Sequence, residues 1–130
     1  MPRTPNRGRR GIGTGEPVSV PLYQAKAEFF LMLGHPVRIR ALELLQERPM
    51  PVRELLARIE VEPSALSQQL AVLRRSGIVT SSREGSTVVY ALTGGDVAEL
   101  LRAARRILTE MLTGQYELLA ELREAEVLST

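Results

Sequence analysis

The chain has 130 residues, of which 44% are hydrophobic and 4% aromatic, and this is typical of one compact domain with an aliphatic core. It contains no cysteine, which excludes disulfides, thiolate metal ligands, cysteine nucleophiles and thiol redox sensing. The formal net charge is +2, no apolar run approaches the roughly 18 residues that span a bilayer, and the N-terminus lacks the apolar stretch of a signal peptide, so we expect a soluble cytoplasmic protein with no membrane partner.

Residues 1–21 are predicted to form a disordered basic N-terminal tail. They are rich in Gly, Pro and Arg, show no hydrophobic period, and carry four arginines against one glutamate. Two interpretations stay open for this tail: an inert extension, or a mobile arm that follows phosphates or enters a minor groove. The charges of the remaining residues nearly balance, so nucleic-acid binding would depend on a local basic patch.

Three helices are predicted in the first half of the chain. LYQAKAEFFLML, residues 22–33, has apolar residues at helical spacing and ends at Gly34. HPVRIRALELLQER opens a second helix, with Pro36 suited to the first helical position. After a short Pro-rich turn, PMPVRELLARI predicts a third, short helix that ends near Ile59.

A fourth helix, predicted from SALSQQLAVLRRSGIV, has two contrasting faces. At about 100° per residue, Leu66, Leu70 and Leu73 lie on one side. The opposite side gathers polar residues around the small Ala71, namely Ser64, Ser67, Gln68 and Arg75. Gly77 follows as a C-terminal cap.

A hairpin and a long helix complete the predicted order of elements. The hairpin joins a strand after Ile78 to the β-branched run from Thr87 to Leu92, through a polar tip at residues 83–87. The final helix runs from Asp96 to about Glu124 with apolar residues at alternating spacings of four and three, interrupted at Gln115. We expect this face to be buried against a second subunit, against the first helix of its own chain, or against both.

The arrangement of helix, turn, helix and hairpin favours DNA recognition as the role of the polar face. In a helix-turn-helix the second helix lies in the major groove, with its N-terminal residues at the base edges. Gln can bond adenine in a bidentate way and Ser can bond several bases, while an arginine can reach phosphate or guanine. The predicted DNA-binding residues are Ser64, Ser67, Gln68, Arg75, Arg83, Ser86 and Thr87. An ordinary solvated helix surface has the same composition, so the order of the elements carries this interpretation.

Four segments in order, LGHPVRIRALELL, VRELLARI, SALSQQLAVLRRSGIV and REGSTVVYAL, resemble the ArsR/SmtB family of winged helix-turn-helix repressors over residues 22–112. The most specific parts are the His-Pro pair with Arg38 and the Leu-Ser-Gln-Gln-Leu run. The resemblance implies a mainly α protein with a β-hairpin wing and five helices. It also implies a homodimer that binds a pseudo-palindromic double-stranded operator and responds to an effector. Gln69 departs from the family, where many members have His, and we expect this position to flank the core and leave DNA contact intact.

The resemblance places the dimer interface on the first and last helices. The residues expected there are Phe29, Leu101, Leu108, Met111 and Leu112. The domain of residues 22–124 would therefore serve both DNA binding and dimerisation, followed by a short C-terminal tail at residues 125–130.

The effector is not specified by the sequence. A metal site is not expected, because there is no cysteine, the last helix has no histidine, and the single imidazole, His35, is better suited to a structural role at a helix start. No cofactor is expected. A small organic ligand at the dimer interface, a protein effector, or no effector beyond protein abundance all remain open; Met32, Met111, Leu112 and Tyr116 are candidates to line an interfacial pocket.

Other classes of function fit the residues less well. Catalysis is not expected, because no nucleophile, base and acid can be assembled around one histidine. A winged-helix module for protein–protein interaction is the alternative to DNA binding, since the chain after Gly114 is acidic and could repel DNA.

Overall fold

The computed structural model describes residues 19–129, so the predicted basic tail lies almost entirely outside the described residues. The chain divides into two compact units, residues 1–35 and residues 36–130. In the first unit, α2 (Leu22–Leu33) forms where the apolar spacing predicts it, and Gly34 ends it by donating its N–H to the carbonyl oxygen of Leu31 at 3.2 Å.

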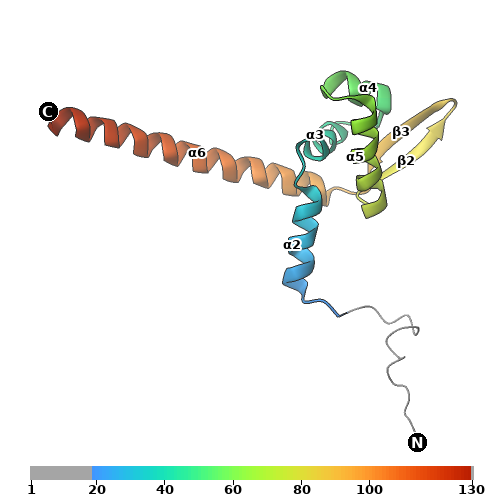
Figure 1. The fold of residues 1–130 in the computed structure, drawn as a ribbon, viewed down its shortest axis with the longest axis horizontal. Helices are drawn as coiled ribbons and strands as arrows, with labels where there is room; N and C mark the ends of the chain where they lie inside the picture. Colours follow the sequence, from blue (N-terminus) through green and yellow to red (C-terminus); the bar gives the residue numbers. More distant parts are fainter. Residues whose placement is uncertain (1–18, 130) are drawn as a thin grey trace, which may run out of the picture. The chain divides into compact units, whose positions relative to one another are not determined.

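The second unit carries the other elements, in the order that the sequence predicts with one addition (Figure 1). The helices are α3 (Pro36–Leu45), α4 (Val52–Arg58), α5 (Pro63–Ser76) and α6 (Asp96–Ser129), and the strands are β1 (Met50–Pro51), β2 (Val79–Glu84) and β3 (Thr87–Leu92). With α2, the described part of the chain has five helices, as expected.

The core of the second unit is aliphatic. Leucines from α3, α4 and α5 have no exposed surface, and Met50 and Val79 join them from the strands; the fully buried leucines are Leu42, Leu44, Leu55, Leu66, Leu70 and Leu73. No polar or charged residue of the described range is buried in this core. Apolar burial therefore holds the helices around the hairpin.

The strand β1 is the addition. The sequence predicts only a Pro-rich turn there, but Met50 pairs with Tyr90 and Pro51 with Val89, which makes an antiparallel sheet of order β1-β3-β2. Pro51 has no N–H to donate, and a proline of this kind is tolerated on the edge strand where it lies. The short strand fixes the start of α4 beside the hairpin.

The hairpin turn follows from its glycine. Glu84 pairs with Thr87, so Gly85 and Ser86 form a two-residue loop. Gly85 has φ +68°, the left-handed conformation that the first loop residue of a primed turn requires. The predicted polar tip is thereby confirmed as a tight turn.

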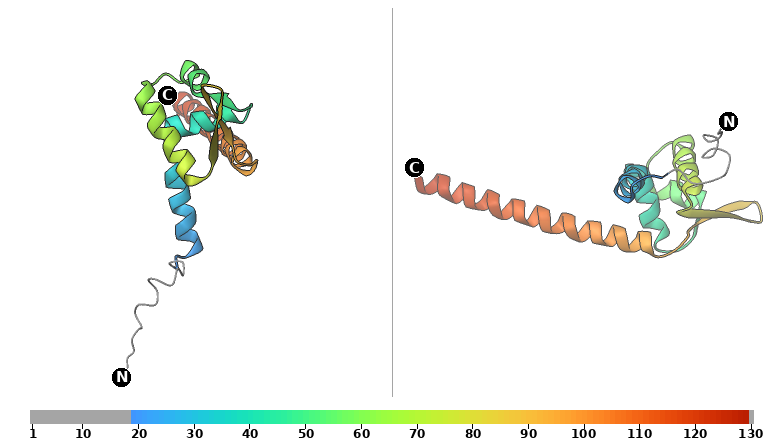
Figure 2. Two further views of the ribbon diagram at one scale, coloured as in Figure 1. Left: turned by 90° about the vertical axis from the view of Figure 1, so that its right-hand side faces the viewer. Right: turned by 90° about the horizontal axis from the view of Figure 1, so that it is seen from below.

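The helix α6 continues to Ser129, beyond its predicted end near Glu124. Its first turns pack on the rest of the unit, with Ala98 buried, and the helix then extends away from α3, α4, α5 and the hairpin (Figure 2). Every residue with a described side chain from Ala104 onward is exposed. Within residues 19–129, no helix is long and apolar enough to cross a membrane.

Candidate nucleic-acid interface

The helix α5 follows α4 across a short turn and forms the second half of a helix-turn-helix (Figure 1). Pro63 occupies its first turn, where a missing N–H costs no hydrogen bond. Gly77 ends it with φ +85° and donates its N–H to the carbonyl oxygen of Arg74 at 3.1 Å, which confirms the predicted cap.

The two faces of α5 are separated as its sequence predicts. Leu66, Leu70 and Leu73 are completely buried against the core. The predicted DNA-binding residues of the helix, Ser64, Ser67, Gln68 and Arg75, are all exposed. Their side chains are therefore free to meet a partner, and α5 itself carries no carboxylate to repel a polyanion.

The hairpin adds exposed polar side chains at its tip. Arg83, near the end of β2, and Ser86, in the two-residue loop, are both exposed. Thr87 is only half-buried, and its Oγ1 accepts a hydrogen bond from Nη1 of Arg53 at 3.4 Å. The three residues are thus accessible, with Thr87 already engaged inside the chain.

Arg53 is a candidate that the sequence pattern does not single out. It lies at the second position of α4, is exposed, and reaches across to the wing through Thr87. A cation between the first helix of a helix-turn-helix and its wing is suited to contact phosphate. The pairing of β1 with β3 places Arg53, which follows β1 in the chain, beside the wing. A strand of two residues is too short for the sequence pattern to predict this pairing.

Gln69 is tied to α3 rather than presented to solvent. Its Oε1 accepts a hydrogen bond from Nε of Arg38 at 2.7 Å, and both side chains are half-buried. The expectation that position 69 flanks the core is confirmed, and Gln69 gains a specific partner.

Comparison with known proteins shows which protein family has this helix-turn-helix and wing. The model of bacterial regulatory proteins of the arsR family matches residues 35–81. Rv0081 of Mycobacterium tuberculosis, an uncharacterized HTH-type transcriptional regulator, is 50% identical over 106 residues, which cover 81% of this chain and 93% of that protein. The chain belongs to the ArsR family of bacterial regulatory proteins. It is a transcriptional regulator with a winged helix-turn-helix, and the predicted resemblance is confirmed.

Solved structures of ArsR-family regulators superpose on this chain. The crystal structure of Rv0081 has a TM-score of 0.69 at 51% identity and covers 75% of this chain and 98% of that one. The transcriptional repressor BigR from Xylella fastidiosa has a TM-score of 0.61 at 38% identity, over 65% of this chain and 87% of that one. The transcriptional activator HlyU of Vibrio cholerae is 39% identical over 84 residues, which cover 64% of this chain and 78% of that one.

The residues predicted for an ArsR-type dimer interface occupy both units. Phe29 of α2 and Leu101 of α6 are half-buried. Leu108, Met111 and Leu112 are more than half exposed, at 56%, 54% and 51%. More than half of the surface of each of these three apolar side chains on α6 is therefore left uncovered.

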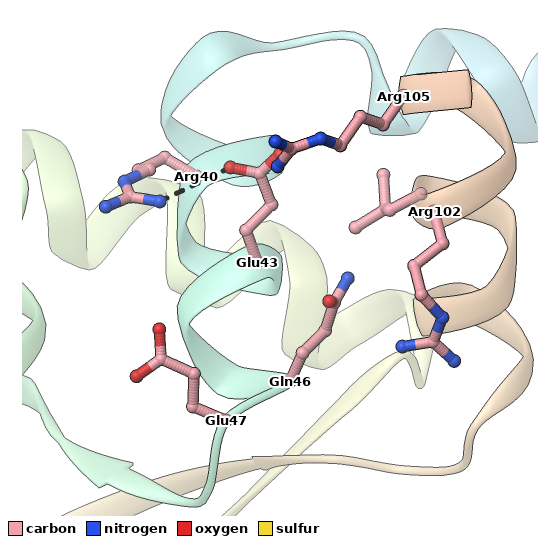
Figure 3. Close-up of a pocket in the computed structure, with 7 residues that line it drawn as sticks. Arg40, Glu43, Gln46, Glu47, Arg102 and Arg105 are labelled. Atoms are coloured by element: carbon pink, nitrogen blue, oxygen red, sulfur yellow. Dashed lines mark hydrogen bonds and ion pairs between the residues drawn. The ribbon is translucent and has the colours of Figure 1, made fainter. Parts of the chain in front are cut away.

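In the described part of the chain, no three His, Asp or Glu side chains lie close enough together to form a candidate metal site. A polar hollow of about 370 Å³ does lie between α3 and α6 (Figure 3). In it Arg40 pairs with Glu43 at 3.4 Å, while Arg102 pairs with Glu99 at 2.6 Å. Arginine and glutamate side chains therefore both line the hollow.

Proposed function

We propose that the protein is a homodimeric repressor that binds a pseudo-palindromic operator in double-stranded DNA. The observation that carries this proposal is the two-faced α5, with its leucines fully buried and Ser64, Ser67 and Gln68 exposed at its N-terminal half. A helix-turn-helix places that half of its second helix against base edges in the major groove.

Each exposed side chain has a role that its chemistry suits. Gln68 would bond the N6 and N7 edge of an adenine in a bidentate way, and the two serines would bond neighbouring bases. Arg75 lies two turns further along α5 and would reach phosphate or guanine. Arg83 at the wing tip and Arg53 at the start of α4 would add phosphate contacts that carry no sequence information.

The unpartnered face of α6 supports the dimer. Fifteen large apolar residues are exposed in the described chain, and ten of them lie on α6 between Ile107 and Leu128. A helix about 50 Å long, at 1.5 Å per residue, gains most of its stability from packing. A second copy of the chain offers the same apolar stripe, so that each α6 would bury the other.

Charge favours an antiparallel pairing of the two α6 helices. Arginines gather at residues 102–106, whereas residues 117–126 carry four glutamates and one arginine. Antiparallel helices set these segments against each other, and parallel helices would set like against like. Gly114 lies near the midpoint, where a Cβ would meet nothing within 4 Å, so the protomer alone does not require a glycine there, and a second helix can approach closely.

Repression would follow from occupancy of the operator, with an effector other than a thiolate-bound metal releasing the protein. The similar protein BigR is named a repressor, which supports this direction, whereas the similar HlyU is named an activator. A reporter gene placed behind the operator tests the direction, since repression predicts lower expression when the protein is present.

Selection from a pool of random duplexes tests the proposed function. The proposal predicts a recurrent motif of two inverted half-sites separated by about one helical turn, or a multiple of it. Recovery of unrelated sequences, with equal retention of any duplex, would contradict it and favour the protein-interaction module instead.

A further inference from the structure

We propose that Arg38 and Gln69 form a positioning pair that fixes the rotation of α5 about its axis and thereby sets the sequence specificity of DNA binding. The inference rests on the proposed function, because it concerns how α5 presents its side chains to DNA. Neither residue is offered as a DNA contact; the pair acts through Gln68 and the two serines.

The bond itself is short and connects distant parts of the sequence. Nε of Arg38, at the third position of α3, donates to Oε1 of Gln69 at 2.7 Å, across 31 residues of chain. A hydrogen bond from an ionised donor is stronger than one between neutral groups. Both side chains are half-buried, which shields the bond from full competition with water.

The place of Gln69 on α5 makes this bond sensitive to rotation. At about 100° per residue, Gln69 lies at the flank of the helix, between the buried stripe of Leu66, Leu70 and Leu73 and the exposed side chain of Gln68. Apolar packing is not directional, so the leucine stripe alone allows the helix to turn by small angles. A hydrogen bond limits both distance and angle, and one at the flank resists that turning.

Small rotations matter at the base edges. Side chains end about 5–6 Å from a helix axis, so a rotation of ~15° moves their tips by about 1.5 Å. A bidentate contact between Gln68 and adenine operates over a distance range of about 0.5 Å. Loss of the positioning pair is therefore expected to weaken sequence-specific contacts while phosphate contacts from flexible arginines persist.

The α3 helix is a suitable anchor for the pair. Its side chains Ala41, Leu42 and Leu44 have no exposed surface, so the helix is held firmly by the core. Two residues after Arg38, Arg40 is exposed and pairs only with Glu43 on the same helix among the interactions described. Arg40 therefore offers a matched control on α3, with the same charge and no hydrogen bond to α5 among the interactions described.

The test compares variants on the duplex selected by the wild type and on a scrambled duplex, by fluorescence anisotropy. Arg38→Met and Gln69→Leu should each reduce the preference for the selected duplex by about tenfold, with affinity for the scrambled duplex changed less than about twofold. The double variant should lose no more than the single variants do, because the two residues act as one unit. Gln69→Glu keeps an acceptor for Arg38 and should retain the preference, as should Arg40→Met.

Several results would overturn the positioning pair. One is an unchanged preference in folded Arg38→Met and Gln69→Leu; another is an equal loss on both duplexes. If Arg38→Met does not fold, the same measurement is made on Arg38→Lys, which keeps the charge but not the Nε donor. If neither variant folds, the pair serves stability alone, and this result would contradict the proposal. A wild type with no duplex preference would instead refute the proposed function itself, so the two failures are distinguishable.

Discussion

At the scale of residues, the proposed DNA contacts are of two kinds: side chains on α5 that would bond base edges, and side chains on the wing that would bond phosphates. Gln68 and the two serines are exposed on a helix with no carboxylate, and their donors and acceptors match base edges. Arg83 is exposed near the end of β2, next to the wing turn, where its long side chain would follow a phosphate. Substitutions at the two kinds of residue should therefore differ in what they change.

Gln68→Ala is expected to relax sequence preference. The variant loses a bidentate base contact worth about 1–3 kcal/mol of discrimination, while its phosphate contacts remain. Affinity for the selected duplex should fall towards that for duplexes with a substituted adenine, measured by anisotropy competition. An equal weakening on all duplexes would contradict the assignment of Gln68 to base reading.

Arg83→Ala is expected to weaken binding to every duplex by a similar factor. It removes one phosphate contact, so the slope of log affinity against log salt should become shallower by about 1. Arg58→Ala is a control, because Arg58 pairs with Glu47 on the body of the domain at 3.3 Å. A slope for Arg83→Ala that equals the wild type would remove the wing tip from the interface.

At the scale of elements, the sequence predicts the helices and the hairpin well because each carries a local signal. The period of the leucines, the proline that opens α3, and the glycines at 34 and 77 each mark a boundary that the structure confirms. The strand β1 and the hydrogen bond between Arg38 and Gln69 could not be predicted from such local signals. Two residues have no period, and a hydrogen bond across 31 residues depends on how α3 packs against α5.

A surface ion pair joins the start of α4 to the segment before β1 and gives the domain a pH-dependent component. Arg48 donates to both carboxylate oxygens of Glu54, and these hydrogen bonds hold the pKa of Glu54 below its ordinary value. The stability from this pair is present above the ordinary pKa of glutamate and is lost as pH falls through the lowered pKa of Glu54.

Glu54→Gln is expected to remove that component. The difference in the free energy of unfolding between wild type and variant should be small at neutral pH, as for exposed pairs in general, and should shrink further in acid. Denaturant unfolding at several pH values measures it. Glu60→Gln is the control, since Glu60 is exposed and has no ion pair among the described residues; a difference that grows in acid would contradict the assignment.

At the scale of the whole molecule, one copy of the chain leaves too much apolar surface uncovered. The leucines of α6 from Leu108 to Leu128 are between 42% and 85% exposed. A dimer would cover them and would also match two α5 helices to two half-sites. Exposure and charge together therefore predict the dimer interface.

Leu108→Asp is expected to break the dimer and with it operator affinity. A carboxylate in an apolar seam must be desolvated without a partner, which costs several kcal/mol. Sedimentation measures the oligomeric state of the variant, and circular dichroism its fold. Thr113→Asp places the same charge on the opposite face of α6 and should stay dimeric; a dimeric Leu108→Asp protein would mean that the interface lies elsewhere.

The most direct test of sequence-specific DNA recognition is the anisotropy of labelled duplexes, selected and scrambled, titrated with wild-type protein at several salt concentrations. We predict tight binding that weakens steeply with salt on both duplexes, with a preference of about 1,000-fold or more for the selected one. Weak binding that is equal on the two duplexes would contradict it, and would leave the polar face of α5 as a surface for a protein partner.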